Sequence, residues 1–163
     1  MRRVVVRRIV VRRVVCVVFV IDAVVGVSII FVVAGKRITG EISASDLLLK
    51  CIFLNAQSIN NKLPELYTLQ EGILYNTKFD LIFICETWLN RGVSDGQLCY
   101  DNRYNVLRHD RPTRAGGVCA FLDKKLEYVS IDLPIEFQHL EVLCLDIVCA
   151  AVKHRYIVVY RTE

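Results

Sequence analysis

The stretches LLLKCIFLN (residues 47–55) and DLIFIC (residues 80–85) decide the fold of this chain. Both are short apolar runs rich in Ile, Leu and Phe, which are typical of strands buried on both faces of a sheet. The residues between them have a helical pattern, and a strand, a helix and a second strand form a parallel pair with a right-handed crossover. The sequence therefore predicts a parallel or mixed sheet that begins with these two strands.

The connecting segment NKLPELYTLQEGILYN (residues 61–76) predicts the crossover helix, because its apolar residues recur at helical spacing. We expect Asn60 or Asn61 to cap the first turn, where Pro64 is tolerated. The face expected to cover the sheet consists of Leu63, Leu66, Ile73 and Leu74.

Five more apolar runs follow, and short turns separate most of them, which favours antiparallel pairing in this part of the chain. The predicted fold class is therefore α/β, with a mixed β-sheet and at least one covering helix. The five runs are YNVLR (104–108), VCAFL (118–122), EYVSI (127–131), LEVLCLDIVCA (140–150) and RYIVVY (155–160).

The net charge of this 163-residue chain is +4, but the positive charge is concentrated at the N-terminus. Six arginines lie in the first 13 residues, and Lys36 and Arg37 follow them. From residue 38 onward, 13 basic residues stand against 16 acidic ones, which leaves about −3 for the rest of the chain. This balance excludes a broadly basic nucleic-acid-binding surface there, so any contact with a polyanion must be local.

The seven cysteines are an odd set embedded in apolar runs, which favours reduced, buried thiols in an intracellular protein over a disulfide framework. Cys144 and Cys149 lie between His139 and His154 and could suggest zinc. Residues five apart on a strand point to opposite faces, however, so one strand cannot direct all four side chains at one ion. We interpret these cysteines as small buried hydrophobic residues.

Residues 1–46 form a leader whose composition differs from that of the domain at 47–163. Its first part, MRRVVVRRIVVRRVV, repeats a five-residue unit and is typical of low-complexity sequence. The run from Val14 to Gly35 contains one charge, Asp22, and is long enough to span a bilayer as a helix. A low-complexity leader and a membrane anchor both remain open, and the polar GEISASD (40–46) predicts a linker.

Three polar residues follow apolar runs of the domain: Asn55 after IFL, Glu86 after LIFIC, and Tyr160 after IVV. Reactive groups collect at strand ends, and a carboxylate next to a buried strand must be solvated, paired or bound to a metal. The alternative is structural: Glu86 caps a turn, Asn55 makes an Asx-turn, and Tyr160 is an edge aromatic residue.

Five ordered blocks of the domain resemble the endonuclease/exonuclease/phosphatase superfamily, most of all the N-terminal endonuclease of non-LTR retrotransposons. The blocks are LNAQSINNK, CETWL, RHDRPTRAGGVCAFL, FQHLEVLCLDI and IVVYR, and they cover about Leu48 to Glu163. The resemblance implies half of a four-layer α/β/β/α sandwich. It also implies that the missing C-terminal half, or another chain, is needed to cover one open face of the first sheet, without which we expect marginal folding.

The resemblance implies a Mg²⁺-dependent hydrolysis of DNA phosphodiesters that nicks a target site in the nucleus. Glu86 matches the glutamate that binds Mg²⁺, Asn55 the asparagine beside it, and Tyr160 the tyrosine that contacts the scissile phosphate. The family's G-D-F-N-like and S-D-H-like blocks have no counterpart here, so we expect the chain alone to be inactive. His109 and Asp110 match a different block and are not substitutes.

The loop from Arg103 to Gly117 could contact DNA phosphates through Arg111 and Arg114, or it could be a solvated charged loop. Its paired glycines are not a P-loop, because no GK[ST] follows them. Two alternatives to a DNA endonuclease remain: a phosphoesterase of the same superfamily with another substrate, and a single-pass membrane protein with a non-catalytic binding domain. A membrane anchor would place the domain outside the cytoplasm, away from chromosomal DNA.

Overall fold

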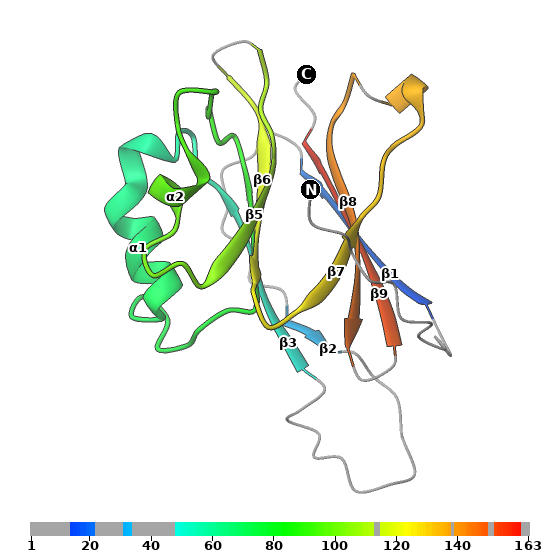
Figure 1. The fold of residues 1–163 in the computed structure, drawn as a ribbon, viewed down its shortest axis with the longest axis horizontal. Helices are drawn as coiled ribbons and strands as arrows, with labels where there is room; N and C mark the ends of the chain where they lie inside the picture. The colour runs from blue at the N-terminus through cyan, green and yellow to red at the C-terminus, as the bar shows by residue number, and fades with distance from the viewer. Residues whose placement is uncertain are drawn as a thin grey trace, which may run out of the picture.

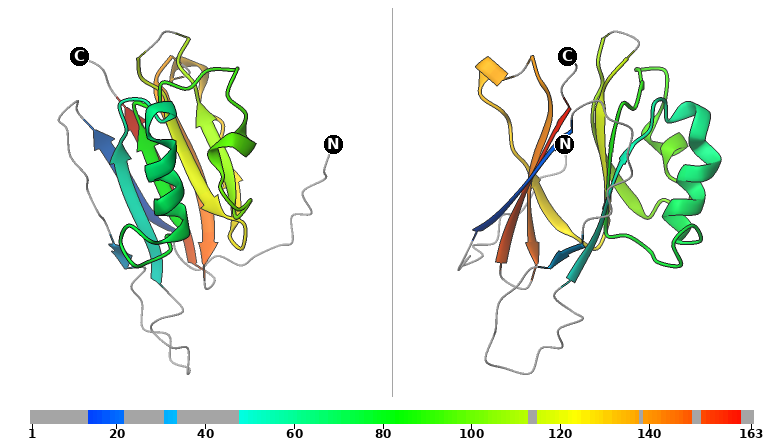
Figure 2. Two further views of the ribbon diagram at one scale, coloured as in Figure 1. Left: turned by 90° about the vertical axis from the view of Figure 1, so that its left-hand side faces the viewer. Right: turned by 180° about the vertical axis from the view of Figure 1, so that it is seen from behind.

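The computed structural model describes residues 14–21, 31–33, 48–112, 115–137, 139–149 and 152–160. Figures 1 and 2 show two sheets that face each other, with helices on the outer side of one of them. The described part of the chain thus has three layers in the order helix, sheet, sheet. The α/β class with a covering helix is as predicted.

The first sheet has five strands in the order β2-β3-β4-β6-β5. Its central pair, β3 and β4, is parallel, and the other neighbours are antiparallel, so the predicted mixed sheet is confirmed. The strands are β2 (Phe31–Val33), β3 (Leu48–Asn55), β4 (Leu81–Cys85), β5 (Tyr104–His109) and β6 (Val118–Asp123).

The second sheet has four strands in the order β1-β9-β8-β7. The pairs β7–β8 and β8–β9 are antiparallel, as predicted for this half of the chain, and β1 lies parallel to β9. The strands are β1 (Val14–Ile21), β7 (Glu127–Ser130), β8 (Glu141–Cys149) and β9 (Val152–Tyr160).

The crossover helix α1 (Leu63–Glu71) is shorter than the apolar pattern predicts. It ends at Gly72, which adopts the left-handed conformation and donates its N–H to the carbonyl of Leu69. Ile73 and Leu74 therefore lie beyond the helix and are 66% and 54% exposed, which corrects their predicted place on the buried face. The residues that α1 buries are Leu66, Leu69 and Gln70.

The start of α1 also differs from the prediction. Asn60 and Asn61 belong to a 3-10 turn, η2 (Asn60–Lys62), and Lys62 is the N-cap without a side-chain cap hydrogen bond. Pro64 occupies the first turn as expected. The remaining helices are α2 (Asp95–Leu98), which has a Ser94–Gln97 capping box, and the 3-10 turn η3 (Ile135–Phe137).

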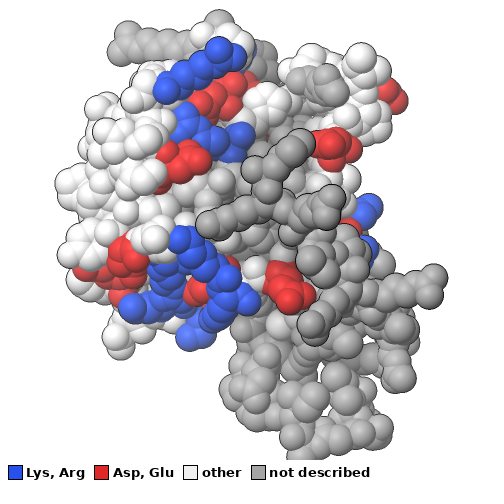
Figure 3. Space-filling model, viewed as in Figure 1, with Lys and Arg blue, Asp and Glu red and all other residues white. Residues whose placement is uncertain are grey.

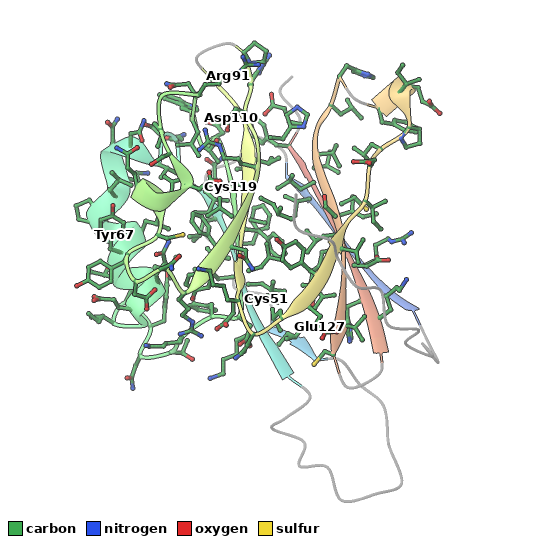
Figure 4. The ribbon with its side chains drawn as sticks, viewed as in Figure 1. Cys51, Tyr67, Arg91, Asp110, Cys119 and Glu127 are labelled. Atoms are coloured by element: carbon green, nitrogen blue, oxygen red, sulfur yellow. The ribbon has the colours of Figure 1, made fainter. Side chains whose placement is uncertain are left out.

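The face of the first sheet that was expected to be open is covered. A core cluster joins Leu81 and Phe83 of the first sheet to Ile147, Tyr156 and other residues of the second. The Phe83 and Tyr156 rings stack with centroids 5.6 Å apart, and Cys51 also lies between the sheets (Figure 4). The chain supplies its own second layer from β7, β8 and β9, because alternate residues of these strands are apolar and face inward.

The leader contributes strands where a membrane-spanning helix was a candidate. All eight residues of β1 pair with β9, and β2 adds an edge to the first sheet. Val and Ile favour strands because their branched side chains pack well on a pleated surface. No helix in the described ranges is long and apolar enough to cross a membrane. The rest of the 14–35 run lies outside those ranges.

Cys51, Cys85, Cys99, Cys119 and Cys149 are free thiols, and Cys51, Cys85 and Cys119 are buried, as the sequence predicts. Burial raises the pKa of the Cys51 and Cys85 thiols to about 12, which keeps them protonated and unreactive. Cys149 packs against the core between the sheets, whereas Cys144 lies on the other face of β8, as their spacing predicts.

His154 of β9 makes the stability of the fold depend on pH. Its side chain is fully buried, neither ring nitrogen has a hydrogen-bond partner, and burial lowers its pKa below the ordinary 6.5. The folded protein therefore holds a neutral ring that the unfolded chain protonates below pH 6.5, so the free energy of unfolding falls as the pH drops. The slope is up to about 1.4 kcal/mol per pH unit until the folded-state pKa is reached.

Urea unfolding followed from pH 8 to pH 5 measures this contribution. We expect His154→Leu to reduce the slope between about pH 6.5 and pH 5, since leucine takes up no proton in either the folded or the unfolded state. His139→Leu, at an exposed histidine, is the matched control and keeps the wild-type slope. Equal slopes in wild type and His154→Leu would contradict the assignment.

Candidate functional site

The strand ends named from the sequence meet at one end of the molecule. Asn55 is the register partner of Cys85, which precedes Glu86 and pairs in turn with Val118. In the second sheet, Tyr160 is the last residue of β9. The C-terminal ends of β3 and β9 point toward the top of Figure 1. The register places Asn55 opposite Cys85, the residue before Glu86, and a hydrogen bond joins Glu86 to Tyr160 of the other sheet.

Glu86 and Tyr160 are in direct contact. The Tyr160 hydroxyl donates a hydrogen bond to Oε1 of Glu86, which joins the two sheets at this end. Burial, followed by this hydrogen bond to the carboxylate, raises the pKa of the Tyr160 hydroxyl. The phenol therefore keeps its proton at neutral pH and acts as a fixed donor beside a half-buried carboxylate.

Asn55 has a side-chain amide with no partner. Both its Oδ1 and Nδ2 atoms are buried without a hydrogen bond, and the same is true of Trp88 Nε1. A buried polar group without a partner costs about 1–3 kcal/mol, so such a group at a strand end indicates a site for a ligand. The Asx-turn considered from the sequence does not form, because the amide makes no hydrogen bond.

The backbone around these residues is strained. Glu86 and Trp88 both have φ of 52°, and Gln57 and Ser58 have φ of 46° and 88°. Each non-glycine residue at positive φ costs of order 1–3 kcal/mol and persists only where the surroundings hold it. Here the hold is a set of backbone hydrogen bonds, including one of 2.9 Å from the Ser58 N–H to the Glu86 carbonyl. Such strain concentrates at functional sites.

Gly116 and Gly117 let another segment cross the Glu86 strand end. The Trp88 N–H donates to the Gly116 carbonyl at 2.9 Å, and the Thr87 N–H donates to the Gly117 carbonyl at 3.3 Å. Both glycines have positive φ, 95° and 87°, and a Cβ on either would lie within 2.6 Å of a neighbouring oxygen. The paired glycines are therefore needed for a close approach of two backbone segments, a role that the glycine pair does not reveal in the sequence alone.

Glu141 is a site residue that sequence reasoning missed. It is the register partner of Tyr160, and its Oε2 accepts a hydrogen bond from the Gly117 N–H at 2.5 Å. Its Oε1 lies 3.3 Å from Nε of Arg111. The sequence did carry a signal for Glu141, because it is a glutamate at the start of an apolar run in the FQHLEVLCLDI block. Glu86 was predicted from a similar position, at the end of an apolar run.

The arginines of the 103–117 loop differ in availability. Arg103 is paired with Asp123, and Arg108 binds Asp110 and backbone carbonyls of the 90–93 segment, so both are structural. The Arg111 side chain is 34% exposed, and Arg114 lies outside the described residues. On the face in Figure 3, basic side chains lie among acidic ones in separate clusters, consistent with a local contact rather than a broad basic surface.

His109 and Asp110 are not a catalytic pair in the described structure. Asp110 is bound by the Arg108 guanidinium, and Figure 4 shows it at the same end as Arg91. His109 is the last residue of β5, where it pairs with Val118. The sequence prediction that these residues do not replace the family's Asp-His block remains the simpler interpretation.

The residues at this end fit a hard divalent cation. Glu86 supplies a carboxylate and Asn55 an amide oxygen without a partner, and Mg²⁺ binds through one or two carboxylates while it keeps several waters. Among the residues that the structure describes, no three His, Cys, Asp or Glu side chains form a metal cage. With only these two protein ligands, a bound cation would complete its coordination with water and substrate oxygens.

Comparison with known proteins supports this fold. No protein-family model matches the chain, and no curated protein matches it. Solved structures similar to it include the crystal structure of the AP endonuclease LMAP from Leishmania major, with a TM-score of 0.53 and 17% sequence identity. The likeness covers 70% of this chain, which spans about 40% of that protein's length. At this identity it shows the fold alone: the chain has an α/β fold similar to that of this endonuclease.

Proposed function

We propose that this end of the molecule is the metal-binding half of a phosphodiester-hydrolysing site, with Glu86 and Asn55 as the ligands of Mg²⁺. The observation that carries the proposal is the unpartnered, buried amide of Asn55. Asn55 lies opposite Cys85 in the sheet, and the next residue, Glu86, carries the carboxylate that Tyr160 orients. The Asn55 amide oxygen and the Glu86 carboxylate are both oxygen ligands. Burying such groups without a partner costs free energy, and a bound cation would offset that cost.

Each of the three residues has a defined role in this proposal. When bound, Mg²⁺ supplies Lewis-acid stabilisation of the charge that develops on the phosphoryl oxygens. Glu86 offers its carboxylate as the anionic ligand. Tyr160, protonated because burial raises its pKa, donates its one hydroxyl hydrogen to Glu86 and so fixes the rotamer of that carboxylate. To donate to a phosphate oxygen instead, the hydroxyl would have to release Glu86. Asn55 offers an oxygen to the cation or its water and an N–H to the phosphate.

DNA is the substrate that the sequence supports best. The CETWL and RPTRAGGV blocks are similar to those of non-LTR retrotransposon endonucleases, and the structural neighbour is named as an AP endonuclease. The proposed origin is therefore a retrotransposon's nicking endonuclease, which would act in the nucleus. Arg111 and Arg114 are proposed phosphate contacts, which position a strand without reading its sequence.

Terbium luminescence tests the metal site directly. Trp88 is the single tryptophan of the chain and lies two residues after Glu86, so its excitation should sensitise Tb³⁺ bound there. We expect the full chain to give a Tb³⁺ signal that Mg²⁺ displaces, and Glu86→Gln to weaken Tb³⁺ binding by about tenfold or more because the anionic ligand is lost. Asn55→Ala should weaken it less, because a neutral ligand is removed.

Glu127→Gln, which removes a charge from an exposed glutamate of β7, is the matched control and should bind Tb³⁺ like the wild type. Equal Tb³⁺ affinity in wild type and Glu86→Gln would overturn the metal site. Because the chain alone is expected to be inactive, the substrate is tested on a version extended with a related C-terminal half. Assays of that version with Mg²⁺ on supercoiled plasmid and on small phosphoesters separate DNA from the other substrates of the superfamily. Glu86-dependent hydrolysis of small phosphoesters without nicking would refute DNA as the substrate.

A further inference from the structure

Glu141 is the acidic residue at this end that the proposed chemistry does not use. It lies at the start of β8, and its carboxylate is 11% exposed. In the register of the second sheet it is opposite Tyr160, so it lies next to the residue that orients Glu86. A second carboxylate this close to the proposed site would repel a bound phosphate unless a basic side chain balances its negative charge.

Two contacts show which groups the Glu141 carboxylate binds. Its Oε2 accepts from the Gly117 N–H, and its Oε1 lies 3.3 Å from Nε of Arg111. One carboxylate thus contacts both Arg111 and Gly117, the last residue of the 103–117 loop. The packing is close, because a Cβ on Gly116 would lie 2.6 Å from both carboxylate oxygens and 2.8 Å from Cδ of Arg111.

Arg111 is held in a way that leaves its outer nitrogens available. Its closest approach to Glu141 is through Nε, and within the described structure neither terminal nitrogen donates a hydrogen bond. Arg108 differs, since both its terminal nitrogens are bonded to acceptors of the protein. A guanidinium held from the side can still present two parallel N–H groups to a phosphate.

We propose that Glu141 is a positioning residue that presents Arg111 to the phosphodiester of a nucleic-acid strand bound beside Glu86 and Tyr160. The inference rests on the proposed function and adds the group that recognises the substrate's charge. It also accounts for an acidic side chain next to the site: Arg111 balances the charge of Glu141, and the two carboxylate oxygens hold Arg111 and Gly117.

Whether Glu141→Gln raises or lowers the affinity for DNA distinguishes a positioning role from a purely electrostatic one. Glu141→Gln removes a negative charge from the end that a polyanion would approach, so electrostatics alone predicts tighter binding of DNA. If Glu141 positions Arg111, binding weakens instead, because the guanidinium is no longer held. Glutamine keeps an acceptor for the Gly117 N–H, so the glycine end of the loop remains tied.

The experiment measures anisotropy of a short fluorescein-labelled DNA duplex with the full chain and Mg²⁺, over a range of salt concentrations. We expect Glu141→Gln and Arg111→Gln each to weaken binding by about tenfold. Both should lower the slope of log affinity against log salt by about 1, the loss of one phosphate contact. The double variant should bind about as weakly as Arg111→Gln alone. Glu127→Gln and Lys78→Gln, at exposed positions, are the charge-matched controls.

Wild-type or tighter binding by Glu141→Gln overturns the inference, and so do additive effects of the two substitutions. If Glu141→Gln fails to fold, Arg111→Lys decides: it keeps the charge but lacks the Nε that Glu141 holds, so full affinity in that variant contradicts positioning. Tb³⁺ binding distinguishes the two proposals, since Glu141→Gln should leave it unchanged. No Glu86-dependent Tb³⁺ signal refutes the proposed function, and no duplex binding by the wild type refutes both.

Discussion

Phe83→Ala is expected to lower the free energy of unfolding by about 3–5 kcal/mol, the usual cost of emptying a core aromatic site. Phe83 is fully buried at the centre of β4, and its ring stacks on Tyr156 of the opposite sheet. The substitution removes this stacking contact between the two layers. Because a domain of this size is stable by only about 5–15 kcal/mol, the variant should be close to unfolding at room temperature.

Equilibrium unfolding in urea, followed by Trp88 fluorescence and by circular dichroism, measures this effect. Phe137→Ala is the matched control, because Phe137 in η3 is 46% exposed and should cost less than about 1 kcal/mol. If both variants lost the same stability, the two sheets would not share the core described above. If Phe83→Ala cost under 1 kcal/mol, the covering of the first sheet by β7, β8 and β9 would be wrong.

Gly117→Ala is expected to cost about 2–5 kcal/mol and to disturb the site at the same time. Its φ of 87° strains any residue with a Cβ by about 1–3 kcal/mol. The added Cβ would lie 2.5 Å from Oγ1 of Thr87, which is fully buried and has no room to retreat, so overpacking adds about 1–3 kcal/mol. Relief of the clash should displace the Thr87 end of the ETWL turn, and with it Glu86.

The measurement pairs urea unfolding with Tb³⁺ titration at a temperature where the variant is folded. Gly96→Ala is the matched control: Gly96 has no positive φ, and its nearest outside atom would be 4.0 Å from the new Cβ. That control, within α2, should be neutral or slightly stabilising. Gly117→Ala with wild-type stability and wild-type Tb³⁺ affinity would show that the close approach of the two segments is not required.

Much of the first sheet could be predicted from short-range pattern. The IFL run before Asn55 and the LIFIC run before Glu86 are apolar on both faces. A strand of this kind is typical of the interior of a sheet that is covered on both sides. The end of α1 was harder, since Ile73 and Leu74 continue the helical spacing. The helix nevertheless ends at Gly72, because glycine readily adopts the left-handed conformation of a C-cap. The apolar spacing predicted a longer helix, whereas the glycine predicted its end.

The second sheet shows why the open face was predicted wrongly. The resemblance to a longer domain suggested that the cover must come from elsewhere, while the alternation in LEVLCLDIVCA already allowed β8 to face the first sheet. The pairing of β1 with β9 joins residues more than a hundred positions apart, and no local pattern specifies such a partner. For the same reason, the apolar run of the leader was equally compatible with a helix in a bilayer.

By itself, the sequence determined the strands of residues 47–163, the mixed pairing of the first sheet, the burial of most cysteines and three polar residues at strand ends: Asn55, Glu86 and Tyr160. These follow from composition and periodicity, which depend on neighbours along the chain. Only the tertiary structure decided that Tyr160 donates to Glu86, that the Asn55 amide has no partner, and that Glu141 holds Arg111. Those contacts join residues on different sheets and loops, and their energies depend on burial and distance, which exist only once the layers have packed.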